Sequence, residues 1–328
     1  MINLTDPQKP GSIAEFMKRT GMLGSCSESR RRTGPSRMAE GIALHRCAET
    51  MLPEEIRIFS DPYAIHFLDP VTLAWARDHP AEAKAFADEL ERKTPGWSNA
   101  IRGRIRFFDD IVQDAAGNGF SQMVILGAGY DTRAYRIGTL KSHVRIFEID
   151  RPETLERKVE ILKKIFGGIP DHVRFIPLDM ADADCWQDLI QAGWSSEGKT
   201  LFLLEGLVMY LPWPAVDHLL AGIAGHAGAG SAVLFDFMPR SLADGTSDDE
   251  SCRVICEWTA KIGEPILSGF SDDEIVPLLE SFGFSGIQII PSRAFAEMYY
   301  TGKRADRNVS GLMSIAYARI PGPDGDRR

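Results

Sequence analysis

The sequence predicts an α/β protein with a parallel sheet that helices cover on both faces. From residue 123 onward, short apolar and β-branched runs alternate with helical segments, which is typical of such a sheet. A turn with two glycines follows the first run, where a doubly wound sheet contacts its ligand. The preceding residues are helical instead, so they predict an N-terminal helical extension.

This extension divides into two parts. Residues 1–34 predict a flexible or loosely ordered segment, because they carry clusters of Pro, Gly and Ser and three consecutive arginines. Residues 35–117 predict a helical cap. Within it, Ser36 can cap a first helix through its hydroxyl, and residues 81–93 are rich in good helix formers.

Residues 98–116 give the clearest helical pattern of the cap. Their apolar side chains fall on one stripe, at spacings of four, three and four: Ile101, Ile105, Phe108 and Val112. Arg104 lies beside this stripe, whereas Arg106 points away from it. We therefore expect different roles for the two arginines.

Seven runs predict the strands, at 123–126, 144–149, 173–178, 201–205, 232–237, 286–290 and 312–320. The main domain is expected to span residues 118–320, with residues 321–328 as a tail. Residues 239–285 depart from the strand and helix rhythm late in this domain. Such insertions commonly wall off a substrate site, so we expect a lid there.

Candidate ligand-binding residues follow four of these runs, at the edge where the carboxyl ends of parallel strands meet. In chain order they are Gly127, Ala128, Gly129 and Asp131, then Glu148 and Asp150, then Asp179 and Met180, and last Glu205 and Gly206. Asp150 stands where an acid can accept a hydrogen bond from a ribose hydroxyl. Asp179 can accept from the amino group of adenine, and Met180 can pack on its ring. This pattern predicts a site for an adenosine-containing cofactor.

A nicotinamide oxidoreductase is one alternative for such a site. The dinucleotide fingerprint requires a third glycine where this chain has Thr132, which disfavours a nicotinamide cofactor. A protein that binds the cofactor without catalysis is a further alternative, and the intact set of strand-end residues disfavours it.

Three motifs together resemble the leucine carboxyl methyltransferase family, and more narrowly its bacterial branch of polyketide-type O-methyltransferases. They are LGAGYDTR at 126–133, FEID at 147–150 and LEGLVMYLP at 204–212. RIRFFDD at 104–110 and SRMAEG at 36–41 extend the similarity upstream, and it covers roughly residues 36–320.

The resemblance implies a class I fold with a seven-stranded, mostly parallel sheet and S-adenosyl-L-methionine as cofactor, which leaves as S-adenosyl-L-homocysteine. It implies that the helical cap contributes to the cofactor site and that no metal takes part. By position it assigns Gly127 to the methionine part, Asp150 to the ribose, Asp179 and Met180 to the adenine, Glu205 to the amino group, and Arg104 and Arg37 to the carboxylate.

Composition restricts the partners and the compartment. The 328 residues have a formal net charge of −9, which argues against a general nucleic-acid binder. No membrane-spanning run or signal-peptide pattern is seen. The five cysteines are scattered and lack a ligand cluster, so we expect reduced thiols without a metal and a cytoplasmic protein. The sequence does not decide the oligomeric state, which could be a monomer or a homodimer.

The acceptor is expected to be a small molecule of natural-product type, with a carboxylate favoured. None of the seven histidines follows a strand where a general base would stand, and a carboxylate needs none because it is ionised near pH 7. Methylation of a phenolic or alcoholic hydroxyl remains the alternative. Tyr210 is a weak candidate for lining the pocket, and Arg240 or Arg293 for anchoring an acid.

Overall fold

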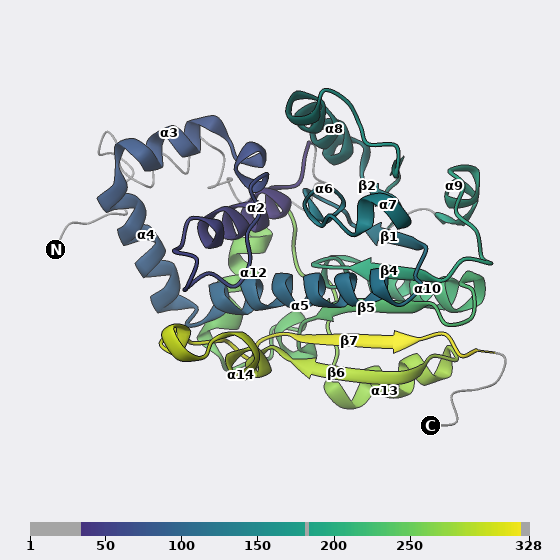
Figure 1. Cartoon of the computed structure of the whole chain (residues 1–328). Coiled ribbons are helices and arrows are strands. Elements are labelled where there is room, and N and C mark those ends of the chain that lie inside the picture. The colour runs from purple at the N-terminus through teal and green to yellow at the C-terminus, as the bar shows by residue number, and fades with distance from the viewer. Residues whose placement is uncertain (1–33, 181–183, 323–328) are drawn as a thin grey trace.

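The computed structural model describes residues 34–180 and 184–322 (Figure 1). Its centre is a seven-stranded sheet in the order β3-β2-β1-β4-β5-β7-β6. The strands are β1 (Gln122–Leu126), β2 (Arg145–Asp150), β3 (Val173–Pro177), β4 (Thr200–Leu204), β5 (Ala232–Phe237), β6 (Ser285–Pro291) and β7 (Ser314–Arg319). Each predicted run thus forms a strand, and the predicted fold class is confirmed.

The sheet is parallel from β1 to β5 and antiparallel at one edge. β1 pairs with β2 on one side and with β4 on the other, so the strand order changes direction there. Open sheets bind ligands at such a switch point. β7 lies between β5 and β6 and runs antiparallel to both.

The cap helices precede the first strand, and the helices of the sheet domain lie between and after the strands. They are α2 (Arg37–Thr50), η1 (Ala64–Phe67), α3 (Pro70–Asp78), α4 (Pro80–Lys93), α5 (Trp97–Gly117), α6 (Arg133–Arg136), α7 (Leu140–His143), α8 (Pro152–Phe166), α9 (Trp186–Gln191), η2 (Val208–Tyr210), α10 (Trp213–His226), α11 (Arg240–Ala243), α12 (Glu250–Lys261), α13 (Asp272–Ser281), η3 (Ser292–Ala294), α14 (Phe295–Tyr299) and η4 (Gly302–Arg304). In the described part of the chain, none of them has the length and apolar character that crossing a bilayer requires.

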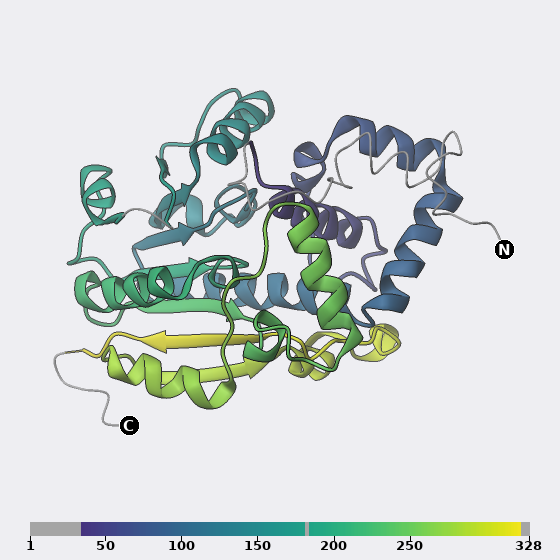
Figure 2. The same ribbon diagram turned by 180° about the vertical axis from the view of Figure 1, so that it is seen from behind.

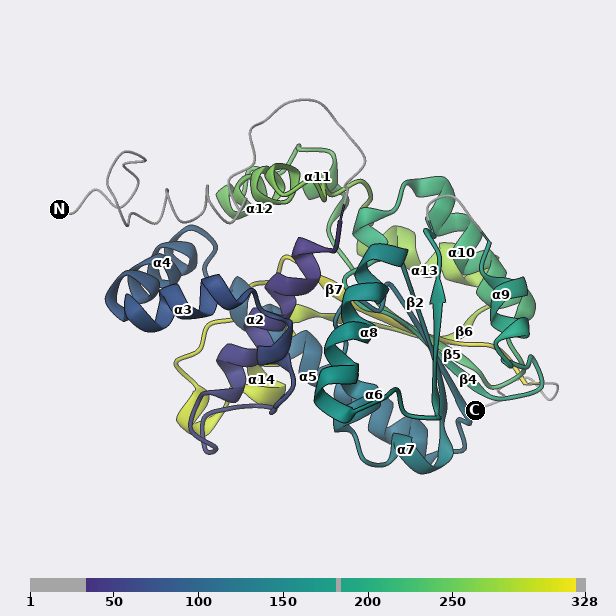
Figure 3. The same ribbon diagram turned by 90° about the horizontal axis from the view of Figure 1, so that it is seen from above.

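Two layers of helices cover the sheet, because alternate residues of each strand point to opposite faces. On β1, Ile125 packs in a core with α5, α6 and α7, whereas Val124 packs in a second core with α9, α10 and α13. The predicted stripe of α5 is buried in the first of these cores. Figure 3 shows the sheet nearly edge-on between these layers.

The helical cap lies beyond the carboxyl ends of the parallel strands. Figure 3 shows α2, α3, α4 and α12 on that side of the sheet domain. Seen from behind, α12 stands beside the cap helices rather than against the sheet (Figure 2). Ser36 caps α2 as predicted, since its side chain accepts a hydrogen bond from the N–H of Ala39 at 3.0 Å.

The segment 239–285, expected as a lid, has two different parts in the structure. α12 and the chain to Leu267 face the cap, whereas α13 buries Ile275 and Leu279 in the core on the sheet. Pro239 and Phe270 form a parallel β-bridge that closes the insertion at its base. The part that can cover a site is therefore shorter than the segment expected from the sequence.

Candidate active site

A cavity of about 1310 Å³ opens at the carboxyl ends of the first four strands. α2, α4 and α12 enclose it from the cap side. Its lining includes most of the residues that the sequence assigned to the site: Arg37, Arg104, Gly127, Ala128, Gly129, Asp131, Asp150, Asp179, Met180, Glu205, Gly206 and Tyr210.

The glycine turn after β1 forms one wall of this cavity. Gly127 and Gly129 have φ values of +68° and +45°, in the left-handed region that favours glycine. A Cβ on Gly127 would lie 2.9 Å from Cδ1 of Leu207. A Cβ on Gly129 would lie 3.1 Å from Cβ of Ala39 in α2. The turn therefore passes closely between the loop after β4 and the cap.

Asp150 at the end of β2 is tied to this turn. Its Oδ2 accepts a hydrogen bond from the N–H of Gly129 at 2.6 Å, and its Oδ1 accepts from the N–H of Arg151 at 2.7 Å. These backbone donors orient the half-buried carboxylate toward the cavity.

Asp179 and Met180 follow β3 at the margin of the cavity. Nε of Arg151 lies 3.3 Å from Oδ2 of Asp179, and the side chain of this acid is partly exposed. Asp179 and Asp150 thus border the same cavity from neighbouring strands, as the sequence predicted.

Arg104 of α5 is buried and joins two acids across the sheet edge. Its Nε donates to Oε1 of Glu205 at 3.0 Å, and its Nη1 donates to Oδ2 of Asp236 at 2.7 Å. The other oxygen of Asp236 accepts from the N–H of Gly206 at 2.6 Å. Sequence reasoning missed Asp236, although an acid inside the apolar run 232–237 is a signal that could have found it.

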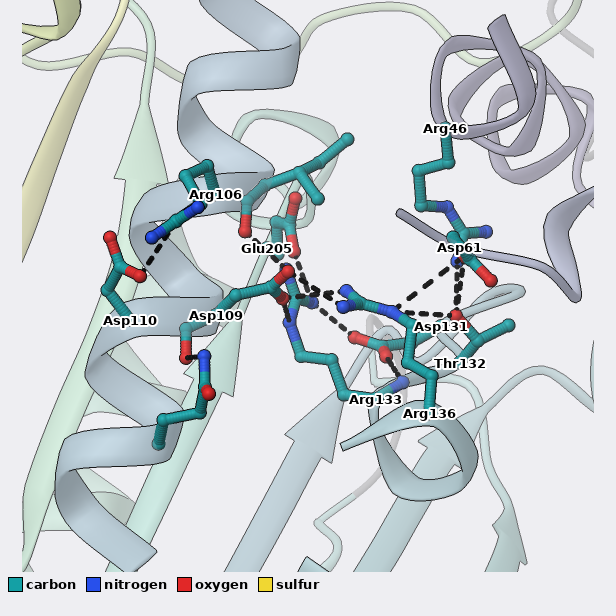
Figure 4. Close-up of polar contacts among 12 residues, drawn as sticks. Arg46, Asp61, Arg106, Asp109, Asp110, Asp131, Thr132, Arg133, Arg136 and Glu205 are labelled. Atoms are coloured by element: carbon teal, nitrogen blue, oxygen red, sulfur yellow. Dashed lines mark hydrogen bonds and ion pairs between the residues drawn. The ribbon is translucent and has the colours of Figure 1, made fainter. Parts of the chain in front are cut away.

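Arg133 is a second missed residue, and it lies at the centre of the polar network in Figure 4. Its Nη1 donates to Asp131 and also to Oε2 of Glu205 at 2.6 Å, while its Nε donates to Oδ1 of Asp109 at 2.7 Å. Burial raises the pKa of Asp131, but the positive charge of Arg133 and of its other basic neighbours outweighs burial and holds the pKa well below its usual range. Glu205 therefore lies between two arginines.

A further set of hydrogen bonds ties the cap to the glycine turn (Figure 4). Arg46 of α2 donates to Oδ2 of Asp61 at 2.8 Å, to Oγ1 of Thr132 at 3.0 Å and to the carbonyl of Tyr130 at 2.6 Å. The hydroxyl of Thr132 donates to the same oxygen of Asp61 at 2.6 Å. Thr132, at the position of the missing third glycine, thus connects the turn to α2.

Glu148 is a correction to the sequence analysis, because the structure places it outside the cavity lining. It lies two residues before Asp150 in β2, fully buried. Its carboxylate pairs with Lys158 of α8 and accepts from the hydroxyl of Tyr135 at 3.2 Å. Burial outweighs the charge of Lys158 and raises the pKa of Glu148 to about 7. The depth of this residue in the strand keeps it out of the cavity.

Glu264 closes the cavity by joining the chain after α12 to the start of α2. Its Oε1 accepts from the N–H groups of Arg37 at 2.8 Å and Met38 at 3.1 Å, and its Oε2 accepts from the hydroxyl of Ser36 at 2.9 Å. A carboxylate at a helix N-terminus is stabilising. Arg37 lines the cavity at this junction, and its side chain is exposed.

His45 of α2 also lines the cavity, and sequence reasoning passed over it because it follows no strand. The signal was its helical spacing from Met38, which lies on the same wall. Burial, and next the charges of Arg102 and Arg104, lower the pKa of His45 to about 3, so the imidazole is neutral at pH 7. Among the described residues, none forms a hydrogen bond with its ring nitrogens.

Tyr210 and Glu40 are two further polar residues that line the cavity. Burial raises the pKa of the Tyr210 phenol. Burial likewise raises the pKa of Glu40, whose Oε1 accepts from the N–H of Asp69 at 2.7 Å. Arg240 and Arg293, considered as anchors for an acid, are exposed and do not belong to the cavity lining.

Comparison with known proteins agrees with this geometry. Residues 39–224 match the family model described as leucine carboxyl methyltransferase. The chain belongs to the leucine carboxyl methyltransferase family. The match begins in α2 and ends in α10, so this family shares both the cap and the strand ends that line the cavity.

Relatives of this chain occur in bacteria. A protein of Rhodococcus jostii (strain RHA1), named "putative S-adenosyl-L-methionine-dependent methyltransferase", is 34% identical over 300 residues, which cover 87% of this chain and 88% of that protein. A protein of Mycobacteroides abscessus with the same description is 34% identical over 232 residues, covering 67% of this chain and 72% of that protein.

Solved structures support the fold of the family. A DUF574 family protein from Streptomyces avermitilis superposes with a TM-score of 0.58 at 14% identity and covers 88% of this chain and 98% of that one. A protein from Thermobifida fusca, described as a "putative methyltransferase", gives a TM-score of 0.54 at 17% identity and covers 73% of this chain and 88% of that one. At such identities the likeness concerns the class I fold alone.

Proposed function

We propose that this chain transfers a methyl group from S-adenosyl-L-methionine to an oxygen of a small molecule, with a carboxylate favoured over a hydroxyl. The observation that carries the proposal is the cavity at the strand ends, which holds the predicted cofactor residues and continues under the cap. Membership of a methyltransferase family supports the reaction class. It also disfavours the nicotinamide alternative.

The residues at the strand ends fit this cofactor. The glycine turn after β1 packs closely against Leu207 and Ala39, and its backbone lines the cavity where the ligand would lie. Asp150 would accept from the ribose hydroxyls, while Asp179 and Met180 would border the adenine. The sulfonium supplies a methyl group that is already strongly electrophilic, so the protein needs chiefly to orient the reactants.

The buried arginines define the end of the cavity that takes the amino acid part of the cofactor. Glu205, held by Arg104 and Arg133, would face the ammonium group. Arg104 and Arg37 would face the carboxylate, with the charge of Arg104 shared among Glu205, Asp236 and the ligand. This network fixes Glu205 before the ligand arrives, which lowers the cost of binding.

The polar groups on the acceptor side favour a carboxylate. A phenol needs a general base whose pKa lies near the working pH. The pKa of His45 is lowered to about 3, and that of Tyr210 is raised, so neither meets this condition at pH 7. A carboxylate is ionised at that pH and attacks without losing a proton.

Methylation of a hydroxyl is the second candidate, and Glu40 is the observation that favours it. Burial raises the pKa of this carboxyl, which makes it a better base than an ordinary glutamate. If Glu40 removed the proton of a hydroxyl acceptor, the rate would rise with pH as Glu40 ionises. A carboxylate acceptor gives no such rise above its own pKa.

A matched pair of acceptors tests the proposal. 2-Naphthoic acid and 2-naphthol share one apolar body and differ in the oxygen group. We expect labelled methyl transfer to the acid to exceed transfer to the naphthol and to be flat between about pH 6 and 8. Transfer to the naphthol alone, lost in Glu40→Gln, would establish the hydroxyl alternative.

A further inference from the structure

The cavity is larger than a single bound cofactor requires. Pockets for single ligands commonly measure about 300–1,000 Å³, and this one measures about 1310 Å³. The residues that fit the cofactor line only its inner part, at the ends of β1 to β4. Its outer part extends between α4 and α12 and is bordered by α2 and α5.

Apolar side chains from four helices line this outer part. They are Leu44 of α2, Phe86 and Leu90 of α4, Trp97 and Ile101 of α5, and Val254 and Trp258 of α12. Three of them remain open to solvent: Leu44 is 47% exposed, Leu90 40% and Trp258 38%. Large apolar side chains that gather in one exposed concavity are typical of a binding site.

Trp258 of α12 packs against α2 at Gly41, which has no side chain. A Cβ on Gly41 would lie 3.7 Å from Cη2 of Trp258. The indole therefore reaches across to α2, next to the residues that close the cofactor end. The apolar part is in this way continuous with the inner part of the cavity.

Several charged residues at the rim are paired within their own helices. On α4, Nζ of Lys93 lies 3.3 Å from Oε1 of Glu89. On α12, Arg253 lies 3.2 Å from Glu250 and 3.5 Å from Glu257. These pairs leave little unbalanced charge to attract a charged ligand body between the helices. The chemistry of the outer part therefore suits an apolar group.

Resting on the proposed function, we propose that the methyl acceptor is an apolar monocarboxylic acid whose hydrocarbon body occupies the space between α4 and α12. Its carboxylate then points inward, toward the part of the cavity that Arg104, His45 and Tyr210 line. The neutral imidazole of His45 and the phenol of Tyr210 can donate hydrogen bonds to this carboxylate. Arg104 meanwhile stays paired with Glu205 and Asp236 at the cofactor end. Methyl transfer converts this anion into a neutral ester and leaves S-adenosyl-L-homocysteine.

Binding of a chain-length series tests this assignment on the full chain. S-Adenosyl-L-homocysteine is first titrated alone by calorimetry, and hexanoate, octanoate, decanoate and dodecanoate are then titrated into the saturated protein. Full burial of a methylene is worth about fourfold in affinity, so the six extra methylenes of dodecanoate could give up to about 4,000-fold. With each methylene contributing about twofold or more, we expect dodecanoate to bind at least about 100-fold more tightly than hexanoate. Equal affinities, or no binding of dodecanoate, would overturn the assignment.

Leu90→Glu places a charge in the outer part, and Ala87→Glu places the same charge on an exposed position of α4 outside the cavity lining. Leu90→Glu should lower the affinity for dodecanoate at least about tenfold, because burying a charge at an apolar contact is unfavourable. Ala87→Glu should bind dodecanoate like the wild type, and both should bind S-adenosyl-L-homocysteine like the wild type. Unchanged dodecanoate affinity in Leu90→Glu would contradict the assignment.

The titrations separate this inference from the proposed function. Chain-length-dependent binding of dodecanoate in a protein that does not bind S-adenosyl-L-homocysteine would support the apolar site and overturn methyl transfer. Binding of S-adenosyl-L-homocysteine without binding of dodecanoate would overturn the acceptor class and leave methyl transfer standing.

Discussion

The N–H of Gly129 donates a hydrogen bond to Oδ2 of Asp150 at 2.6 Å. The turn after β1 and the end of β2 are thereby fixed to each other before any ligand binds. A charge-assisted hydrogen bond of this kind is stronger than a neutral one. It orients the carboxylate that we expect to accept hydrogen bonds from the ribose hydroxyls. Asp150 is therefore expected to stabilise the turn and also to bind the ligand, and variants must distinguish these two roles.

Asp150→Ala should weaken binding of S-adenosyl-L-homocysteine by about 10- to 100-fold, because a hydrogen bond to a charged acceptor is worth about 1.5–3 kcal/mol. Asp150→Asn keeps a hydrogen-bond acceptor for the N–H of Gly129, so its affinity for S-adenosyl-L-homocysteine should fall less. Calorimetry gives the affinities, and circular dichroism checks that each variant is folded. A folded Asp150→Ala variant with wild-type affinity would show that this carboxylate does not contact the ligand.

Gly127→Ala should lower the free energy of unfolding by more than about 1 kcal/mol, because a residue with a Cβ is unfavourable at positive φ. The added Cβ also meets Leu207 at 2.9 Å, so the turn must move. Gly138→Ala is the matched control, since no atom lies within 4 Å of its Cβ position and its φ is not in the left-handed region. Denaturant unfolding measures both, and equal stabilities would contradict the tight turn.

Arg104→Ala should destabilise the fold by about 3–5 kcal/mol, because it leaves a buried carboxylate unpaired. It should also abolish tight binding of the cofactor. Arg106→Ala should cost less, about 1–2 kcal/mol, since its pair with Asp110 is 40% and 36% exposed and its main further loss is one hydrogen bond to the carbonyl of Ile58. If unfolding and calorimetry give the same result for both variants, the different roles assigned to the two helix faces are wrong.

Stability should depend on pH through Glu148. Burial raises its pKa from 4.5 to about 7, so between these values the folded state binds more protons than the unfolded state. The contribution of Glu148 to stability is therefore fully present below pH 4.5 and is lost as the pH rises toward 7. Glu148→Gln lacks this titration. Unfolding free energies of the two proteins should therefore diverge over that window, with the wild type declining, and a constant difference would contradict the assignment.

The sequence was sufficient for the strands and for most of the strand-end residues that line the cavity. Alternating apolar runs located the sheet, and strand-end positions located Asp150, Asp179 and Glu205, because both follow from local pattern and from the topology of parallel sheets. Glu148, a candidate from the same pattern, lies outside the cavity lining, since a pattern at the end of a strand does not tell how deeply each acid lies.

The arginine network could not be predicted from local pattern. The contacts of Arg133 with Asp109 and of Arg104 with Asp236 join distant parts of the chain, and they exist only after α5 packs on the sheet. His45 is a similar case, because its place in the cavity depends on how α2 lies over the strand ends. Residues of the cap become candidates only once that packing is known.

Product analysis tests the central claim most directly. The protein is incubated with S-adenosyl-L-methionine labelled in its methyl group and with a mixture of apolar acids and phenols, and the labelled product is treated with mild base. The account predicts a labelled methyl ester that base hydrolyses to release labelled methanol. A labelled aryl ether that survives base would contradict it and assign the reaction to a hydroxyl acceptor.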